Sequence, residues 1–242
     1  MNKKWLLFLL ILFLILWINI SLATTLSPVE IGIRTISEDY PALKAELQIP
    51  VFQGFQNEVV AEKIQQQVEN DIFHFLNNLV EDSNDYIKKA REAGWQIRKY
   101  IGETIFELHY LSPNILSFSL VYYSYTLGAH GFTEKVSYNF DLLTGEKVTI
   151  DQLFINYTTY KDIINREIKR KIFQEKEVYF SEGTKFTTIK EDQPFYIEYD
   201  GIVIYFGLYE IAPYAAGIRY FKIPFRVFDN LRPENLRYFG IN

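Results

Sequence analysis

The chain has 242 residues, of which 48% are hydrophobic and 23% charged, and its formal net charge is −5. This balance is typical of a globular protein and argues against a disordered chain. Cysteine is absent, which excludes disulfides, thiolate metal sites and cysteine nucleophiles.

The first 23 residues have the pattern of an export segment. Lys3 and Lys4 precede an apolar run over residues 5–18, and residues 21–23 place small side chains where a signal peptidase would cleave. About 14 apolar residues are fewer than the roughly 20 that span a bilayer, which favours a cleaved secretory signal. An uncleaved membrane anchor over residues 5–23 is the alternative. Both interpretations place the rest of the chain outside the cytoplasm, with membrane contact only through this segment.

Removal of residues 1–23 would change the net charge from −5 to −7, because the segment contains Lys3, Lys4 and no acidic residue. A mildly acidic body has no basic surface for nucleic acid, so no nucleic-acid partner is expected. It would attract a cationic partner. Negative charge that only favours solubility is the simpler alternative.

Residues 24–127 predict strands around one long amphipathic helix. From Asn57 onward apolar residues recur at every fourth position, which predicts a helix. The Asp-Ser-Asn sequence at 82–84 predicts a break or a new cap, and Gly94 a terminator. Alternating or aromatic runs predict strands at 29–36, 40–52, 104–111 and 115–126.

Residues 128–242 show the same mixture of elements. A second amphipathic helix is expected to begin at Thr158 or Thr159, and Asp200-Gly201 predicts a two-residue hairpin turn. The remaining predicted elements are strands at 132–142, 147–150, 195–199, 202–206 and 218–223, and a helical turn at 152–154. The mixture of strands and helices predicts an α+β fold of antiparallel sheets with two amphipathic helices. Because no low-complexity linker separates the halves, we expect two closely packed subdomains, 24–127 and 128–242.

A corner with glycines on both sides of a lone histidine joins two aromatic strands. Gly128, His130 and Gly131 are the candidate binding residues of this corner. The alternative is structural: His130 hydrogen-bonds across a tight turn and fixes the neighbouring strands, so that the corner is a shaped junction between the two halves.

The loop over residues 209–217 is the second candidate site. Pro213 restricts the backbone, Tyr209 and Tyr214 offer amphipathic rings, and Gly217 permits close approach. Such a loop presents an aromatic anchor to a protein or a sugar at low entropic cost. The alternative is a packed loop whose tyrosine belongs partly to the core.

Catalytic and metal-binding patterns are missing from the sequence. The three histidines have no HxH or HExxH spacing, and no GxSxG motif occurs. Asp141, Glu146 and Asp151 could form an acid/base pair, but Asp141 and Asp151 stand before turns, where aspartate caps backbone amides. We therefore expect no metal, no cofactor and no catalysis.

Five blocks carry a family resemblance. They are YTLGAHG at 125–131, NFDLLTG at 139–145, DQLF at 151–154, FYIEYDGIVIYF at 195–206 and YEIAPYAAG at 209–217. Because the five blocks occur in this order, the chain resembles the extracytoplasmic domain shared by the anti-sigma factor RsiV and the peptidoglycan deacetylase PdaC. The resemblance covers residues 37–231. This region is a pair of domains of unknown function. Only four residues precede the apolar run, where RsiV-like proteins have a sigma-binding region, and no deacetylase domain follows.

The resemblance implies a secreted or membrane-anchored binding module of the cell envelope without catalysis. In the RsiV branch the module is similar to a lysozyme receptor, so the expected partner is a cationic lysozyme-like protein, with peptidoglycan next. The alternative is a stand-alone peptidoglycan-acting hydrolase or deacetylase.

Overall fold

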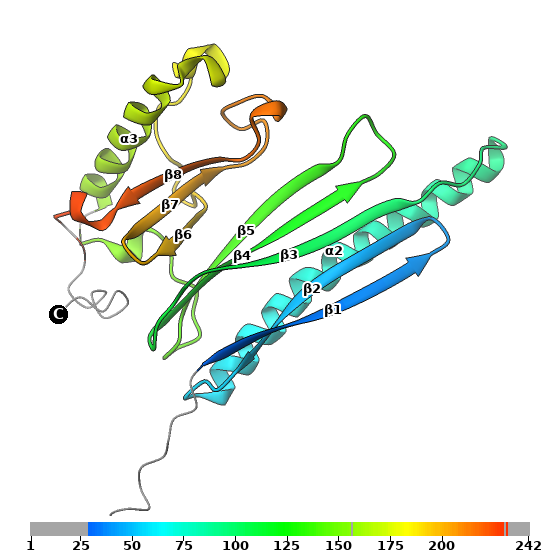
Figure 1. Ribbon diagram of the computed structural model, residues 1–242, viewed down its shortest axis with the longest axis horizontal. Helices are drawn as coiled ribbons and strands as arrows, with labels where there is room; N and C mark the ends of the chain where they lie inside the picture. The colour runs from blue at the N-terminus through cyan, green and yellow to red at the C-terminus, as the bar shows by residue number, and fades with distance from the viewer. Residues whose placement is uncertain (1–28, 156, 230, 232–242) are drawn as a thin grey trace, which may run out of the picture.

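The computed structural model describes residues 29–155, 157–229 and 231. The expected signal peptide or anchor, residues 1–23, lies outside these residues. Within them, no helix is both long and apolar enough to cross a membrane. Two sheets, each with one long helix on a face, make up the described structure (Figure 1).

The first sheet has five strands in the order β1-β2-β3-β4-β5. Their bounds are Glu30–Tyr40, Leu43–Gln53, Tyr100–Leu111, Ile115–Tyr125 and Phe132–Asp141. Only β2 and β3 are parallel, because helix α2, Glu58–Glu92, carries the chain back between them. The other neighbours are antiparallel. The predicted α+β class is confirmed, with this one parallel pair inside the first sheet.

Helix α2 covers one face of the first sheet (Figure 1). The side chain of Asn57 accepts hydrogen bonds from the backbone N–H groups of Val59 and Val60 and so caps the helix. The expected interruption at 82–84 is absent, and α2 continues without a break. The Ser83 hydroxyl is buried and donates to the Val80 carbonyl within the helix. Burial of the apolar face therefore overrides the local preference for a break.

Strand β4 explains how the two faces of the first sheet differ. Its apolar side chains, which face α2, are Leu116, Phe118, Leu120 and Tyr122. Ser117 and Ser119 alternate with them and point to the other face, where the second sheet packs.

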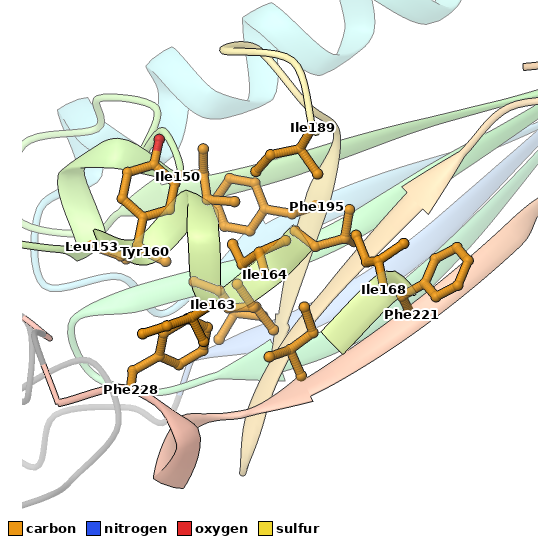
Figure 2. Packing of buried hydrophobic residues seen from close by; sticks show 14 of the residues in the cluster. Ile150, Leu153, Tyr160, Ile163, Ile164, Ile168, Ile189, Phe195, Phe221 and Phe228 are labelled. Carbon is orange, nitrogen blue, oxygen red and sulfur yellow. The ribbon is translucent and has the colours of Figure 1, made fainter. Parts of the chain in front are cut away.

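The second sheet is antiparallel and has the order β6-β7-β8. Its strands are Phe195–Glu198, Gly201–Phe206 and Arg219–Pro224, and helix α3 is Tyr157–Gln174. Ile164 and Ile168 of α3 pack with Phe221 of β8 in a buried core (Figure 2). The predicted hairpin at Asp200-Gly201 is confirmed.

The structure corrects two expectations about the middle of the chain. The predicted strand 147–150 is reduced to a single bridge between Lys147 and Phe140, because Val148 and Ile150 are buried in the second core. Strand β5 pairs with β4, so the corner at 128–131 is the turn of a hairpin and not a junction between halves. The expected boundary at 127/128 therefore falls inside the first sheet, and residues 142–194 connect the two sheets.

Candidate functional site

The β4–β5 turn and the β7–β8 connection lie at the same end of their sheets and contact each other (Figure 1). The Tyr214 hydroxyl donates to the Gly131 carbonyl at 2.8 Å, and the Tyr209 hydroxyl lies 3.3 Å from His130 Nε2. The His130 and Tyr214 rings stack with centroids 4.0 Å apart, and the Tyr209 and Tyr214 centroids are 5.7 Å apart. We call His130, Tyr209 and Tyr214 the aromatic cluster.

His130 is exposed but held in one orientation. Its Nδ1 lies 2.8 Å from the Gly131 carbonyl oxygen, which accepts a hydrogen bond when this nitrogen is protonated. Nε2 then accepts from the Tyr209 hydroxyl. Both ring nitrogens therefore have protein partners, while the residue itself is exposed.

The two corner glycines differ in their surroundings. A Cβ on Gly131 would lie 2.3 Å from the Tyr123 ring, whereas a Cβ on Gly128 would meet only the His130 carbonyl oxygen at 3.8 Å. The left-handed backbone of this turn belongs to Leu127, with φ 67°. A bulky side chain rarely adopts this conformation, which is found preferentially at functional sites.

The β7–β8 connection is held by polar and apolar anchors. Tyr209 has φ 64° and Gly217 has φ 69°, so the loop turns through the left-handed region twice. Glu210 accepts from the Gly207 N–H at 2.8 Å and pairs with Lys190 at 2.7 Å. Ala212 is buried. These contacts hold the backbone in place, which reduces the entropy that binding would otherwise cost.

Pro213 is exposed and directly precedes a 3₁₀ turn at Tyr214–Ala216, whose end is Gly217. The predicted loop residues thus shape the backbone that presents Tyr214. Of the seven candidate residues, all but Gly128 either join the aromatic cluster or shape its two turns. Their role in binding stays a prediction.

A buried polar seam between the sheets fixes the relative position of the two turns. The Ser117 hydroxyl donates to Asn139 Oδ1 at 2.7 Å and accepts from the Ile197 N–H at 2.8 Å. Asn139 Nδ2 donates to the Phe195 carbonyl at 3.0 Å. Strand β6 is thereby hydrogen-bonded onto the face of β4 and β5. Sequence reasoning missed this seam, although serines in alternate positions of an otherwise apolar strand were a usable signal.

A buried cation lies farther along the seam. Lys135 pairs with Glu107, and its Nζ lies 5.2 Å from the ring centroid of Tyr196 and 5.0 Å from that of Tyr220. His109 stacks on Tyr196 with centroids 3.7 Å apart and lies 2.8 Å from the Ser119 hydroxyl. Burial, and next the positive charge of Lys135, lowers the pKa of His109 to about 4.

The low pKa of His109 makes the stability of the protein depend on pH. Because an unfolded histidine titrates near 6.5, the unfolded state binds more protons than the folded state between about pH 4 and 6.5. The free energy of unfolding should therefore fall as the pH decreases from 7 to 4.5. We expect a loss of about 2 kcal/mol, less than the full pKa difference implies, because solvent partly screens the ring.

Urea unfolding at both pH values measures this loss. His109→Phe keeps an aromatic ring against Tyr196 but cannot titrate, so its stability should change less over the same interval. An equal change in both proteins would contradict the assignment to His109.

Two cavities lie away from the aromatic cluster. One, of about 570 Å³, is lined by Val29, Phe55 and Pro113 among others. The second, of about 620 Å³, lies between Ser137 of β5 and the segment 191–195. Among the described residues, no group of three histidine or carboxylate side chains is placed to hold a metal ion.

Comparisons with known proteins identify the two halves. Residues 36–133 match the family model described as Deacetylase PdaC, and residues 151–226 match the one described as Protein of unknown function (DUF3298). The chain is thus a two-domain protein in which a PdaC domain precedes a DUF3298 domain, an arrangement that indicates an extracytoplasmic module of unknown function. It belongs to the PdaC/RsiV-like paired-domain proteins, as the five sequence blocks predicted.

Solved structures share the fold. A DUF3298 family member from Bacteroides fragilis is 19% identical with a TM-score of 0.68, covering 88% of this chain and 97% of the other. A DUF3298 family protein from Pseudomonas aeruginosa is 13% identical with a TM-score of 0.57, covering 86% of this chain and 96% of the other. At these identities the likeness shows the fold alone. No curated protein matches the chain.

Proposed function

We propose that this chain is a non-catalytic binding module of the cell envelope and that the aromatic cluster is its contact surface. The observation that carries the proposal is the convergence of His130 and Tyr209, which are 79 positions apart in the sequence, beside Tyr214. Rigid aromatic rings at an accessible surface supply large contact area at low entropic cost. A binding role is favoured over catalysis because the partners of His130 are a backbone carbonyl and a tyrosine hydroxyl, and, among the described residues, neither the serine nor the carboxylate of a catalytic triad contacts it.

The proposed partner is a cationic, lysozyme-like protein. The negative charge expected after removal of residues 1–23 would accelerate its association, and the aromatic cluster would supply the close contacts. Cell-wall glycan is the second candidate, because exposed aromatic rings also pack against the apolar faces of sugars. Both partners occur outside the cytoplasm, which agrees with the export segment expected at residues 1–23.

Calorimetric titration of residues 24–242 with lysozyme, at low and at moderate salt, tests the proposal. We expect binding that weakens as salt increases, because salt screens the attraction between the charges. Tyr214→Ala should weaken binding about 10- to 100-fold, the effect expected of a central aromatic contact. The matched control is Tyr199→Ala, because Tyr199 is 77% exposed in the turn at the opposite end of β7. It should bind like the wild type.

Other outcomes would redirect the proposal. Absence of heat and of complex at both salt concentrations would eliminate the protein partner. Binding of soluble peptidoglycan fragments that is lost in Tyr214→Ala would then indicate the glycan. Turnover of those fragments, lost in His130→Ala, would replace binding with catalysis.

A further inference from the structure

Strand β1 has a long edge that no other described strand covers. It is 11 residues long, stands at the end of the sheet and pairs only with β2. An uncovered edge presents a row of unpaired N–H and C=O groups to any second strand, and proteins usually blunt such edges with charged side chains, lysine above all, with proline or with short length. The sequence of β1, EIGIRTISEDY, contains neither lysine nor proline, and its four charged residues are of both signs, so they can attract a second copy in a suitable register.

The other sheet edges are shorter or partly occupied. Strand β8, the free edge of the second sheet, has six residues, and Lys171 donates from α3 to the carbonyl of Lys222 there. The end of β5 is bridged by Lys147. Strand β6 is hydrogen-bonded to the first sheet through Ser117. Among the described residues, β1 is therefore the edge best suited to a second strand.

The sequence of β1 is complementary to itself in one antiparallel register. When Ile36 lies opposite Ile36 of a second copy, Arg34 lies opposite Glu38 of that copy, and Gly32 lies opposite Tyr40. These pairs share one face of the sheet, since they are separated by two residues each. Opposite charges, paired β-branched residues and an aromatic ring beside a glycine all stabilise neighbouring strands.

The two same-face registers shifted by one step in either direction are repulsive. Centring on Arg34 places two arginines opposite each other, and centring on Glu38 places two glutamates opposite each other, which is destabilising. Helix α2 packs on β2 and β3, so it leaves the outer edge of β1 accessible. The Arg34 guanidinium, which contacts Glu69 at 2.8 Å, is half exposed and can accept a second carboxylate partner.

We propose that two copies of this chain associate through antiparallel pairing of their β1 strands, centred on Ile36, and form one continuous sheet with a two-fold axis. In such an isologous contact every pair away from the two-fold axis occurs twice, so the Arg34–Glu38 attraction is doubled. The aromatic cluster lies where the β4–β5 turn meets the β7–β8 connection, on strands well separated from β1 in the sheet order, and stays accessible in both copies. The dimer is thus bivalent toward a multivalent target such as a cell wall.

A single engineered thiol tests the register, because the chain has no cysteine. In Ile36→Cys the two thiols face each other across the axis, where directly opposite Cβ atoms are about 5 Å apart, close enough for a disulfide. We expect most of this variant to form a disulfide-linked dimer on mild oxidation. In Ile33→Cys, the control on the same strand, the two thiols are separated by six residues, or roughly 20 Å, and should stay unlinked. Equal linking of both variants, or of neither, would overturn the register.

Sedimentation equilibrium tests the association without a thiol. Residues 24–242 should show a concentration-dependent dimer. Glu69→Gln removes the ion pair that Arg34 forms within its own chain, so that the charge at residue 34 acts only across the interface. In this background, Glu38→Arg should raise the dissociation constant of the dimer at least tenfold. Arg34→Glu combined with Glu38→Arg should restore it.

A protein that stays monomeric at about 100 μM, where a complex of even micromolar affinity would be populated, overturns the proposal. Failure of the exchanged pair to restore the dimer overturns the register. Neither outcome affects the proposed role of the aromatic cluster, which a monomer can fulfil.

Discussion

Asn139→Leu is expected to lower the free energy of unfolding by about 3 kcal/mol, because it removes a buried side chain that hydrogen-bonds both to Ser117 and to the Phe195 carbonyl. Asn139 and Ser117 are both buried, so the substitution leaves their hydrogen-bond partners unsatisfied inside the protein. The loss also releases strand β6 from the first sheet. Urea unfolding at pH 7 measures the effect.

The matched control is Asn78→Leu, at an exposed position of α2, which should change stability by less than about 0.5 kcal/mol. Ser117→Ala and Asn139→Ala should be strongly non-additive in a double-mutant cycle, because each removes the same hydrogen bond. An unsatisfied buried polar group usually costs at least about 1 kcal/mol. If the free energy of unfolding of Asn139→Leu lies within about 1 kcal/mol of the wild-type value, the seam does not hold the sheets together.

Gly201→Ala should destabilise the second sheet by roughly 3 kcal/mol or more, the range of a backbone clash in a packed core. A Cβ at this position would lie 2.4 Å from the carbonyl oxygen of Ile223 and 2.9 Å from Cα of Pro224. Both atoms belong to the backbone of β8, which cannot rotate away as a side chain can. The variant must therefore break the pairing of Gly201 with Pro224 at the end of the ladder.

Thermal unfolding followed by circular dichroism checks this expectation. Gly128→Ala is the control: its Cβ would meet only one atom, at 3.8 Å, and its φ is not in the left-handed region. We expect its midpoint to stay near that of the wild type. Equal midpoints for Gly201→Ala and Gly128→Ala would show that β8 can move to accept a methyl group.

The requirement for glycine at position 201 illustrates what local sequence patterns miss. Asp200-Gly201 correctly predicted a hairpin, because turn chemistry is local. The contact that requires glycine, however, comes from Ile223 of β8, 22 positions later in the chain. Strand β8 pairs with β7 on the side opposite to the β6 hairpin partner. The same applies to Ser83, where a local preference for a break yielded to burial of the helix around it.

The candidate site shows a similar division. Residue types alone indicated the 128–131 corner and the 209–217 loop, because glycine, proline and exposed aromatic residues have distinctive backbone and surface chemistry. Their convergence was beyond sequence reasoning, since it depends on the packing of β6 against β4 and β5. The corner was expected to join the two halves of the chain. It connects β4 and β5 instead, and these two strands pair with each other in the first sheet.

The sequence by itself determined the α+β class, the positions of nearly all strands and both helices, and the membership in the PdaC/RsiV-like family. These follow from periodicity and short motifs, in which each residue is interpreted with its near neighbours. Only the tertiary structure decided that β5 completes the first sheet, that Ser117 and Asn139 join the sheets, and that His130 meets Tyr209 and Tyr214. Strand pairing and buried hydrogen bonds depend on partners distant in the chain, which no local pattern specifies.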